Sequence, residues 1–217
     1  IIHGRTEKSP QFSLPLYAPP KNLIEIDLKK FSNENFGNFT SSRKKLSALI
    51  NQKENKIHEI TPLPSREEID FEGALEGKNL ELAWVDPIDA FFLHIQGSGA
   101  VQLKNGTKIS LGYAAQNGMK YEPIGKFLKE YIPKEKMSLQ SIESVLRGKL
   151  KHNLRKILSA NPSYIFFRRL KGRAQTTIGS EVTDGRTLAV DPEYFPLGML
   201  GHLTFSNPIE KEGKLIF

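Results

Sequence analysis

The chain has 217 residues, 38% of them apolar and 25% charged, and its 31 Lys and Arg against 24 Asp and Glu give a formal net charge of +7. This composition is that of a globular protein and excludes an intrinsically disordered chain, a collagen and a coiled coil. The absence of cysteine excludes disulfide scaffolds and thiolate sites, and no apolar run approaches the ~18 residues that a membrane-spanning helix needs.

The first part of the chain is typical of an extended segment followed by short strands. Pro10, Pro15, Pro19 and Pro20, with little periodicity around them, favour an extended entry over residues 1–40. Alternating apolar and charged side chains predict a strand over Ile24–Leu28. Between Leu46 and Ile60 the apolar residues fit either one helical face or the two strands of a β-hairpin, and we favour the hairpin.

The middle of the chain is predicted to contain one helix and then a series of strands. Ser65-Arg-Glu-Glu68 has the pattern of a capping box, so we expect a helix from Ser65 to Glu76 that ends at Gly77. Strand-like stretches follow at residues 80–85, 90–95, 100–103 and 108–113. Asn105-Gly106 favours a type I′ hairpin turn, in which both central residues have positive φ. We therefore expect an antiparallel meander here.

The last third of the chain changes from helical to strand-like periodicity. Apolar residues recur at helical spacing from Ile124 to Leu158 and predict two or three helices. Asn161-Pro162 should end them, because a residue before proline avoids the α region. Further strand-like pieces lie at residues 164–167, 187–190, 202–205 and 215–217, a pattern that suits part of a β-barrel.

Several kinds of site find no support in the sequence. The five histidines form no HxxxH or HxH pair, so we expect no metal site. Gly97-Ser98-Gly99 lacks the third glycine of a dinucleotide fingerprint and the spacing of a GxSxG nucleophile elbow, so we expect neither a cofactor nor a serine nucleophile. Lys and Arg are scattered without a run of five, which argues against a nucleic-acid patch.

What remains is a polar, glycine-rich series of segments flanked by aromatic residues. It consists of Gln96, Gly97, Ser98, Gly99, Gly112, Tyr113, Asn117, Gly118, Asn161, Ser163, Tyr164, Phe166 and Phe167. Glycines let a ligand approach the backbone, amides and hydroxyls hydrogen-bond sugar hydroxyls, and aromatic faces stack on sugar rings. The series therefore indicates a saccharide groove. The alternative is that the glycines serve turns and the phenylalanines belong to the core.

Cleavage of a glycoside needs at least one carboxylic acid, and the candidates are Asp70, Asp86, Asp89, Asp184 and Asp191. Asp191 is the most interesting, because it follows the apolar Leu188-Ala-Val190 and precedes Pro192. A turn role is the alternative for Asp191, and turn chemistry is also typical of Asp86 before Pro87. No pair of carboxylates stands out.

A set of sequence strings carries a resemblance to a known family. The strings are Leu14-Pro-Leu-Tyr-Ala-Pro-Pro20, Arg66-Glu-Glu-Ile69, Asp89-Ala-Phe-Phe-Leu-His-Ile-Gln-Gly-Ser-Gly99, Gly112-Tyr-Ala-Ala-Gln-Asn-Gly118, Ile124-Gly125, Met137-Ser-Leu-Gln140, Asn161-Pro-Ser-Tyr-Ile-Phe-Phe167, Gly185-Arg-Thr-Leu-Ala-Val-Asp-Pro192 and Pro196-Leu-Gly198. In these strings and their order the chain resembles the membrane-bound lytic murein transglycosylase A family. They span most of the chain.

The resemblance implies a mainly β fold with some helices, in which a double-psi β-barrel, incomplete here, is interrupted by an inserted small β-barrel-like domain. Residues 1–11 would end the first barrel segment, 12–163 would be the insert, and 164–217 would be a truncated second barrel segment. The glycan would lie in a groove between the domains. The residues that this implies for substrate binding are Gln96, Gly97, Ser98, Gly99, Tyr113, Asn117, Gly118, Tyr164, Phe166 and Arg186.

The resemblance also implies an activity, namely cleavage of the β-1,4 bond between N-acetylmuramic acid and N-acetylglucosamine to leave a 1,6-anhydromuramoyl end. One aspartate would act as acid and base, since the second nucleophile is the sugar's own 6-hydroxyl. No cofactor is implied. The partner would be the glycan strands of peptidoglycan. The protein would be a monomer and would act at the periplasmic face of a Gram-negative outer membrane. Contact with the membrane would run only through an anchor absent from this chain.

The sequence departs from the family pattern near its end. The family's catalytic aspartate is expected just after Phe217, and Asp191 matches a different aspartate of the barrel module. The chain starts without Met and stops in a strand-like stretch, so we expect a piece of a longer protein. The alternatives are a non-catalytic peptidoglycan-binding fragment and, on the pI of about 9.4 alone, a nucleic-acid-binding β-barrel.

Overall fold

The structure, a computed structural model, describes residues 1–28, 45–53, 56–172, 176, 178–204, 209–211 and 214–216. The chain divides into two compact units, Ile1–Ala174 and Gln175–Phe217. Within the described residues no helix combines the length and apolar character needed to cross a membrane. The assignment of residues 1–11, 12–163 and 164–217 to insert and barrel stays a prediction.

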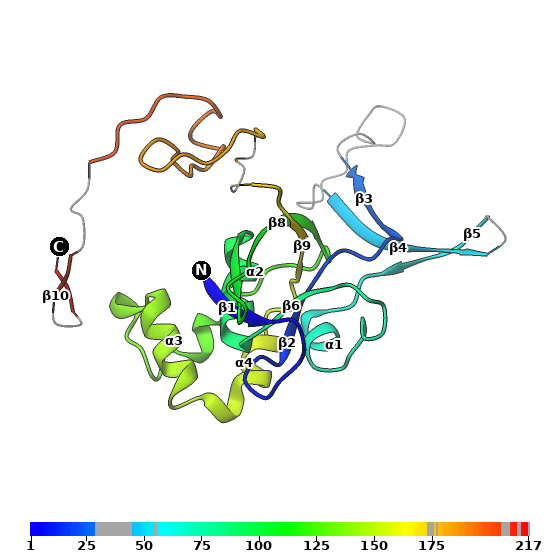
Figure 1. Cartoon of the computed structure of the whole chain (residues 1–217), viewed down its shortest axis with the longest axis horizontal. Helices are drawn as coiled ribbons and strands as arrows, with labels where there is room; N and C mark the ends of the chain where they lie inside the picture. The colour runs from blue at the N-terminus through cyan, green and yellow to red at the C-terminus, as the bar shows by residue number, and fades with distance from the viewer. Residues whose placement is uncertain are drawn as a thin grey trace. The chain divides into compact units, whose positions relative to one another are not determined.

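The first unit is built on a six-stranded sheet in the order β2-β6-β1-β7-β8-β9 (Figure 1). Its strands are β1 (Ile2–Arg5), β2 (Leu14–Tyr17), β6 (Glu81–Val85), β7 (Gly99–Leu103), β8 (Lys108–Gln116) and β9 (Ile165–Arg169). The edge strands approach each other, because the Tyr164 hydroxyl donates to the Pro15 carbonyl at 3.4 Å. The sheet is therefore nearly closed into a barrel, and the prediction of a mainly β fold with some helices is confirmed.

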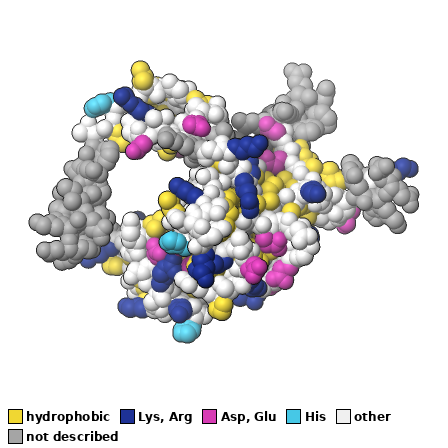
Figure 2. Space-filling view, viewed as in Figure 1, with side chains coloured by type: hydrophobic (Ala, Val, Ile, Leu, Met, Phe, Trp, Pro, Cys, Tyr) yellow, Lys and Arg dark blue, Asp and Glu magenta, His cyan; other side chains and the backbone are white. Residues whose placement is uncertain are grey.

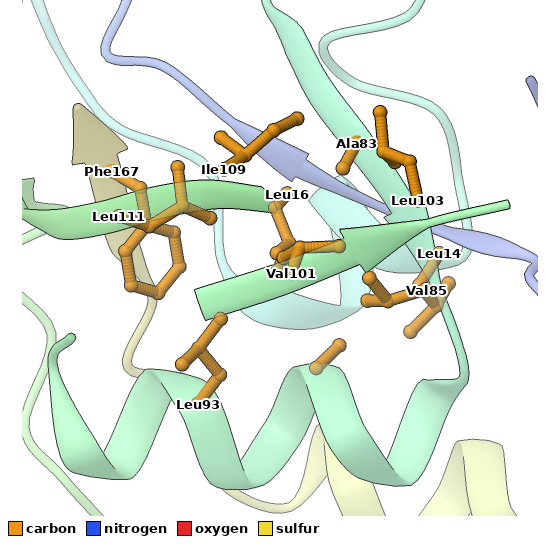
Figure 3. Close-up of a cluster of buried hydrophobic side chains, with 11 residues drawn as sticks. Leu14, Leu16, Ala83, Val85, Leu93, Val101, Leu103, Ile109, Leu111 and Phe167 are labelled. Atoms are coloured by element: carbon orange, nitrogen blue, oxygen red, sulfur yellow. The ribbon is translucent and has the colours of Figure 1, made fainter. Parts of the chain in front are cut away.

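The main core lies between this sheet and helix α2 (Pro87–Gln96). Leu16, Val85, Val101 and Leu111 have no exposed surface, and Figure 3 shows Leu93 of α2 pointing toward Val101. A Cβ atom at Gly99 would lie 2.5 Å from Leu93 Cδ1, so a larger residue where β7 begins would force the Leu93 side chain to move. Burial of each large aliphatic side chain stabilises the unit by roughly 1.5–3 kcal/mol.

Helix α2 corrects the predicted strand over residues 90–95. Its apolar run is continuous, and periodicity alone cannot separate a buried strand from a buried helix. The end signals decide for the helix: the Asp86 carboxylate accepts hydrogen bonds from the backbone N–H groups of Ile88 and Asp89, and Pro87 stands at the first position. Gly97, at φ 76°, ends it. Gln96–Gly99 therefore joins a helix to a strand, and not two strands. The predicted antiparallel meander is wrong apart from the β7–β8 pair, because β6 pairs with β1 and β2 and not with β7.

We predict that Asp86→Ala destabilises the first unit by about 1–2 kcal/mol, because it removes this cap and one ion pair to Arg147. Urea denaturation monitored by circular dichroism measures the change. Arg147→Met is the control, since it breaks the exposed ion pairs and keeps the cap; its cost should stay below about 1 kcal/mol. Equal losses in the two variants would assign the effect to the ion pairs.

The β7–β8 hairpin is confirmed, but its turn differs from the prediction. Gly106 has a φ of 83° while Asn105 does not have positive φ, so the turn is not type I′. Instead the Gly106 N–H donates to the Leu103 carbonyl, and the Leu103 N–H donates to the Thr107 carbonyl. This is the three-residue loop with a single left-handed glycine, which suits the strand twist equally well.

Two other local predictions have different outcomes. The capping box is confirmed, because Ser65 accepts from the Glu68 N–H and the Glu68 carboxylate accepts from the Ser65 N–H. Helix α1 (Arg66–Asp70) is shorter than predicted, since the chain passes through Phe71 to a left-handed Gly73. The predicted strand and hairpin before it are confirmed as β3 (Leu23–Asp27), β4 (Lys45–Lys53) and β5 (Lys56–Pro62), which form a separate three-stranded sheet.

The helical section between β8 and β9 also matches its prediction. It contains α3 (Leu139–Arg147) and α4 (Leu154–Ser159), with the 3-10 helices η2 (Ile124–Phe127), η3 (Lys134–Lys136) and η4 (Lys151–Asn153). Their apolar faces form a second core cluster with Ile88 and Phe91 of α2. The helices end at Ala160, just before Asn161-Pro162, as expected.

The described part of the second unit contains a single two-stranded sheet, β10 (Ile209–Lys211) with β11 (Lys214–Ile216). The predicted strand at 215–217 is confirmed as far as the structure describes it. The strands predicted at 187–190 and 202–204 are wrong, and Phe205 lies outside the described residues. Thr187 instead closes a turn by donating its N–H to the Thr183 carbonyl. In the part of the second unit that the structure describes, no strand pairs with these short segments.

Candidate functional site

A cavity of about 320 Å³ lies where α1, the end of α2, the end of β8 and the start of β9 meet. Its lining residues are Arg66, His94, Ile95, Gln116, Tyr121, Asn161, Ser163 and Ile165. We call it the central cavity. Three of the strings singled out in the sequence, at 89–99, 112–118 and 161–167, come together around it.

Arg66 forms one wall of the central cavity and is 1% exposed. It is the first residue of α1, so the capping box at Ser65, which starts the helix, fixes the position of the Arg66 backbone. The guanidinium donates to the carbonyls of Asn161, at 3.1 Å, and Ser163, at 2.7 Å, and to the Asp70 carboxylate at 3.3 Å. It also lies over the rings of Phe91 and Tyr164. Arg66 thus holds the 161–163 segment against α1.

Asp70 is the buried counter-charge of Arg66. Burial raises the pKa of the Asp70 carboxyl to about 6, although the charge and hydrogen bond of Arg66 act to lower it. Oδ2 accepts from Arg66, while Oδ1 is buried without a hydrogen-bond partner among the described residues. Asp70 therefore acts as the ion-pair partner of Arg66, and it is not among the residues that line the cavity.

His94, on α2, contributes a neutral imidazole to the cavity wall. Burial, and next the nearby Arg66 charge, lower the pKa of His94 well below its ordinary value. Its Nδ1 accepts the Ile165 N–H at 3.2 Å, so the proton lies on Nε2, which is buried without a partner in the described structure. The ring packs 4.2 Å from Tyr164, centroid to centroid. Nε2–H is thus a buried donor that lacks a partner among the described residues.

Asn117 and Asn161 organise the loops around the cavity. The Asn117 amide donates to the carbonyls of Pro64 and Pro162, and its oxygen accepts from the N–H groups of Met119 and Tyr164. The Asn161 oxygen accepts from Glu122 and Ser163. Both side chains are almost fully buried. The structure gives Asn117, predicted to bind substrate, these four protein partners.

Among the other residues predicted to bind substrate, some are exposed near the cavity and some are fully buried. Gln96 and Ser98 are exposed and follow the lining residues His94 and Ile95 at the end of α2. Tyr164 and Phe166 have no exposed surface, so in this structure neither ring offers a face to a sugar. Their substrate contacts, like those of Gly97, Gly99 and Asn117, stay predictions.

Tyr113 of β8, and Gly118 two residues after the end of β8, lie next to the three-stranded sheet. Tyr113 is 42% exposed and donates its hydroxyl to Glu25 at 3.4 Å. Burial and the Glu25 carboxylate raise the pKa of Tyr113 to about 12. A Cβ atom at Gly118 would lie 3.3 Å from Ser47. These residues are positioned to join the two sheets of the first unit.

Arg186 and Asp191 belong to the second unit. Asp191 is exposed, and its carboxylate accepts the Glu193 N–H at 2.9 Å while its carbonyl accepts from Tyr194 and Phe195. That is the turn role weighed as the alternative for Asp191. Arg186 is exposed, and its N–H donates to Thr183. The roles predicted for both residues remain predictions.

Sequence reasoning did not identify the lining residues Arg66, His94, Gln116 and Tyr121 as a site. Arg66, His94 and Gln116 lie inside strings that carry the family resemblance, so membership of these strings could have marked them as candidates. Tyr121 lies outside all of the strings. Arg66 also has an Asp four residues later, the spacing of a helical ion pair.

The lining of the cavity contains amides, hydroxyls, a buried imidazole and the Arg66 guanidinium, which is paired with Asp70, and it contains no carboxylate. The described residues contain no cluster of three or more His, Cys, Asp or Glu side chains that could hold a metal ion. Such an arrangement is suited to binding a neutral, hydroxyl-rich ligand.

Comparisons with known proteins agree on one family. A family model described as the MltA specific insert domain matches residues 1–168. A relative from Vibrio cholerae named membrane-bound lytic murein transglycosylase A is 38% identical over 109 residues, which are 48% of this chain and 29% of the relative. The chain thus spans less than a third of that relative.

Two solved structures share the fold. MltA from Neisseria gonorrhoeae has a TM-score of 0.69 and 26% identity, and the match covers 91% of this chain and 54% of that one. A membrane-bound lytic murein transglycosylase from Agrobacterium tumefaciens has a TM-score of 0.64 and 28% identity over 78% of this chain and 45% of that one. The chain covers about half of each solved protein.

Proposed function

Because the chain belongs to the MltA-specific insert domain family, we propose that it is the glycan-binding part of a peptidoglycan lytic transglycosylase. The resemblance seen in the sequence is thereby confirmed at the level of the family. The names of the relatives supply the substrate class, since each is a murein transglycosylase.

The observation that supports this function best is the meeting of three sequence strings at the central cavity. The Gln116 amide and the Ser163 hydroxyl can hydrogen-bond the hydroxyl and acetamido groups of amino sugars. Tyr121, which is 47% exposed, offers an aromatic face at the rim. Gln96 and Ser98 extend the polar surface beyond the end of α2.

The proposed reaction is cleavage of the β-1,4 bond between N-acetylmuramic acid and N-acetylglucosamine with formation of a 1,6-anhydro end. It needs a carboxylic acid to protonate the leaving oxygen. The lining of the central cavity has no such group, and Asp70 is held by Arg66. We infer that residues of the first unit hold the glycan, and that the acid is contributed from outside their cavity. Asp191 is the candidate in this chain.

The proposed setting follows the family. Residues 12–163 would be an insert between barrel segments 1–11 and 164–217. The protein would act as a monomer on glycan strands at the periplasmic face of a Gram-negative outer membrane.

We predict that Tyr121→Ala and Gln116→Ala each weaken binding of a hexamer of N-acetylglucosamine about fivefold or more, by removing a stacking face or an amide from the cavity. Isothermal titration calorimetry measures the affinity. Tyr131→Ala is the matched control for the aromatic change, since Tyr131 is 40% exposed and does not line the cavity. Equal weakening by Tyr131→Ala would argue against this cavity as the site.

The reaction itself is tested by incubating the chain with isolated murein sacculi and searching the released fragments for 1,6-anhydromuramic ends by mass spectrometry. Their appearance supports cleavage by these residues. Binding to sacculi without such products supports the second candidate function, a non-catalytic peptidoglycan-binding module, which the carboxylate-free lining of the cavity favours.

A further inference from the structure

The positive charge of the chain is concentrated in one section. Residues 120–160 contain ten Lys and Arg and four Glu, a net charge of +6 out of +7 for the whole chain. All of these residues lie in the described part of the first unit. Figure 2 shows Lys and Arg side chains over the helices at the lower left of the view. This section therefore produces a positive potential that attracts anions.

A second hollow, of about 430 Å³, opens within this section. We call it the basic hollow; it is lined by Glu67, His152, Asn153, Arg155, Lys156, Ser159 and Ala160. Two of its residues, Glu67 and Ala160, directly adjoin Arg66 and Asn161 of the central cavity. The two linings thus come from consecutive residues at two points of the chain, and the hydrogen bonds of Arg66 hold these two points together.

The polar groups of the basic hollow are incompletely paired. Arg155 donates to Glu67 at 3.1 Å and to Glu72 at 2.9 Å. Lys156 forms no ion pair among the described residues. The Ser159 hydroxyl is buried and has no hydrogen-bond partner in the described structure. The Arg155 guanidinium already has two carboxylate partners, so the Lys156 ammonium, in the same lining as the unpartnered Ser159 hydroxyl, is the positive group that can pair with a further carboxylate.

We propose that the basic hollow binds carboxylates of the peptide that branches from murein glycan while the sugars occupy the central cavity. This inference rests on the proposed function. Murein differs from chitin in the lactyl ether on alternate sugars, which carries a peptide with free carboxylates. A concave basic site next to a sugar site is where such a branch would reach. A flat anionic membrane is the competing occupant, and a hollow of this shape fits a short branch better.

The experiment compares three ligands on the 217-residue chain by calorimetry: a tetrasaccharide of alternating N-acetylglucosamine and N-acetylmuramic acid with its peptides, the same glycan with the peptide carboxylates amidated, and the glycan without peptides. We expect the peptide-bearing glycan to bind about threefold or more tightly than the other two at low salt. Lys156→Ala and Ser159→Ala should each remove most of this advantage and leave binding of the peptide-free glycan unchanged.

Lys134→Ala is the matched control, because it removes one charge from the same section outside the hollow. An equal effect of Lys134→Ala would overturn the proposal in favour of general electrostatic attraction. Equal affinity for all three ligands would overturn it while leaving the proposed function intact, since glycan binding would persist. Absence of glycan binding altogether would instead count against the proposed function. Binding of phosphatidylglycerol vesicles that Lys156→Ala abolishes, with no peptide advantage, would reassign the hollow to lipid.

Discussion

Replacing Arg66 with methionine is expected to lower the free energy of unfolding by about 3–5 kcal/mol, the largest effect of any single change proposed for this chain. Arg66 is 1% exposed, and its loss leaves the Asp70 charge buried without a counter-ion. It also leaves the carbonyls of Asn161 and Ser163 without their guanidinium donors. Methionine keeps much of the volume, so the loss reports on charge and hydrogen bonding.

Urea denaturation at pH 7 measures this effect, and Arg155→Met is the matched control. Arg155 also forms ion pairs, to Glu67 and Glu72, but its side chain is 54% exposed. Exposed ion pairs contribute at most about 1 kcal/mol, so the control should remain within that range. A loss for Arg66→Met no greater than for Arg155→Met would show that the buried network does not stabilise the fold.

The second large effect is a pair of opposite pH dependences, one from Asp70 and one from His94. The pKa of Asp70 is raised from 3.8 to about 6 by burial, so the folded state binds the extra proton between these values. The free energy of unfolding contributed by Asp70 therefore falls as the pH rises from about 4 to 6. The slope is up to about 1.4 kcal/mol per pH unit.

His94 acts in the opposite direction. Burial lowers its pKa well below 6.5, so below pH 6.5 it is the unfolded state that binds the extra proton. The free energy of unfolding contributed by His94 therefore falls as the pH drops below about 6.5, with the same limiting slope.

Single variants should separate the two contributions. We expect Asp70→Asn to lose stability on acidification from pH 6.5 to 4.5, and His94→Gln to lose stability when the pH rises from 4 to 6. Urea denaturation in a series of buffers measures both slopes, and the double variant should remove both. Curves for the two single variants that run parallel would contradict the assigned protonation states.

Local signals in the sequence predicted much of the secondary structure. The β7–β8 hairpin, the β4–β5 hairpin, the capping box at Ser65 and the helical section before Asn161 are confirmed, because their hydrogen bonds join residues that are close along the chain. The strand predicted at 90–95 was wrong because a continuous apolar run fits either structure and only its caps, Asp86 and Gly97, distinguish them. The type I′ turn was wrong because a loop one residue longer suits the same strands.

The family could also be recognised from sequence strings, and the polar segments they mark do meet at one cavity. From the sequence alone, Tyr164 and Phe166 fit equally well as rings that stack on a sugar or as residues of the hydrophobic core, because an aromatic side chain can do either. Their burial is decided by the closure of β9 toward β2, which links Tyr164 to Pro15 across 149 residues.

The parallel pairing of β1 with β7 and the protonation of the site depend on contacts that no local pattern encodes. Arg66 bonds carbonyls 95 and 97 residues away, and His94 accepts an N–H 71 residues away. Capping, turns and periodicity act within a few residues, so the amino-acid order alone determines them. Burial, and with it the charge state of Asp70 and His94, depends on which distant segments exclude water, and that is a property of the assembled fold.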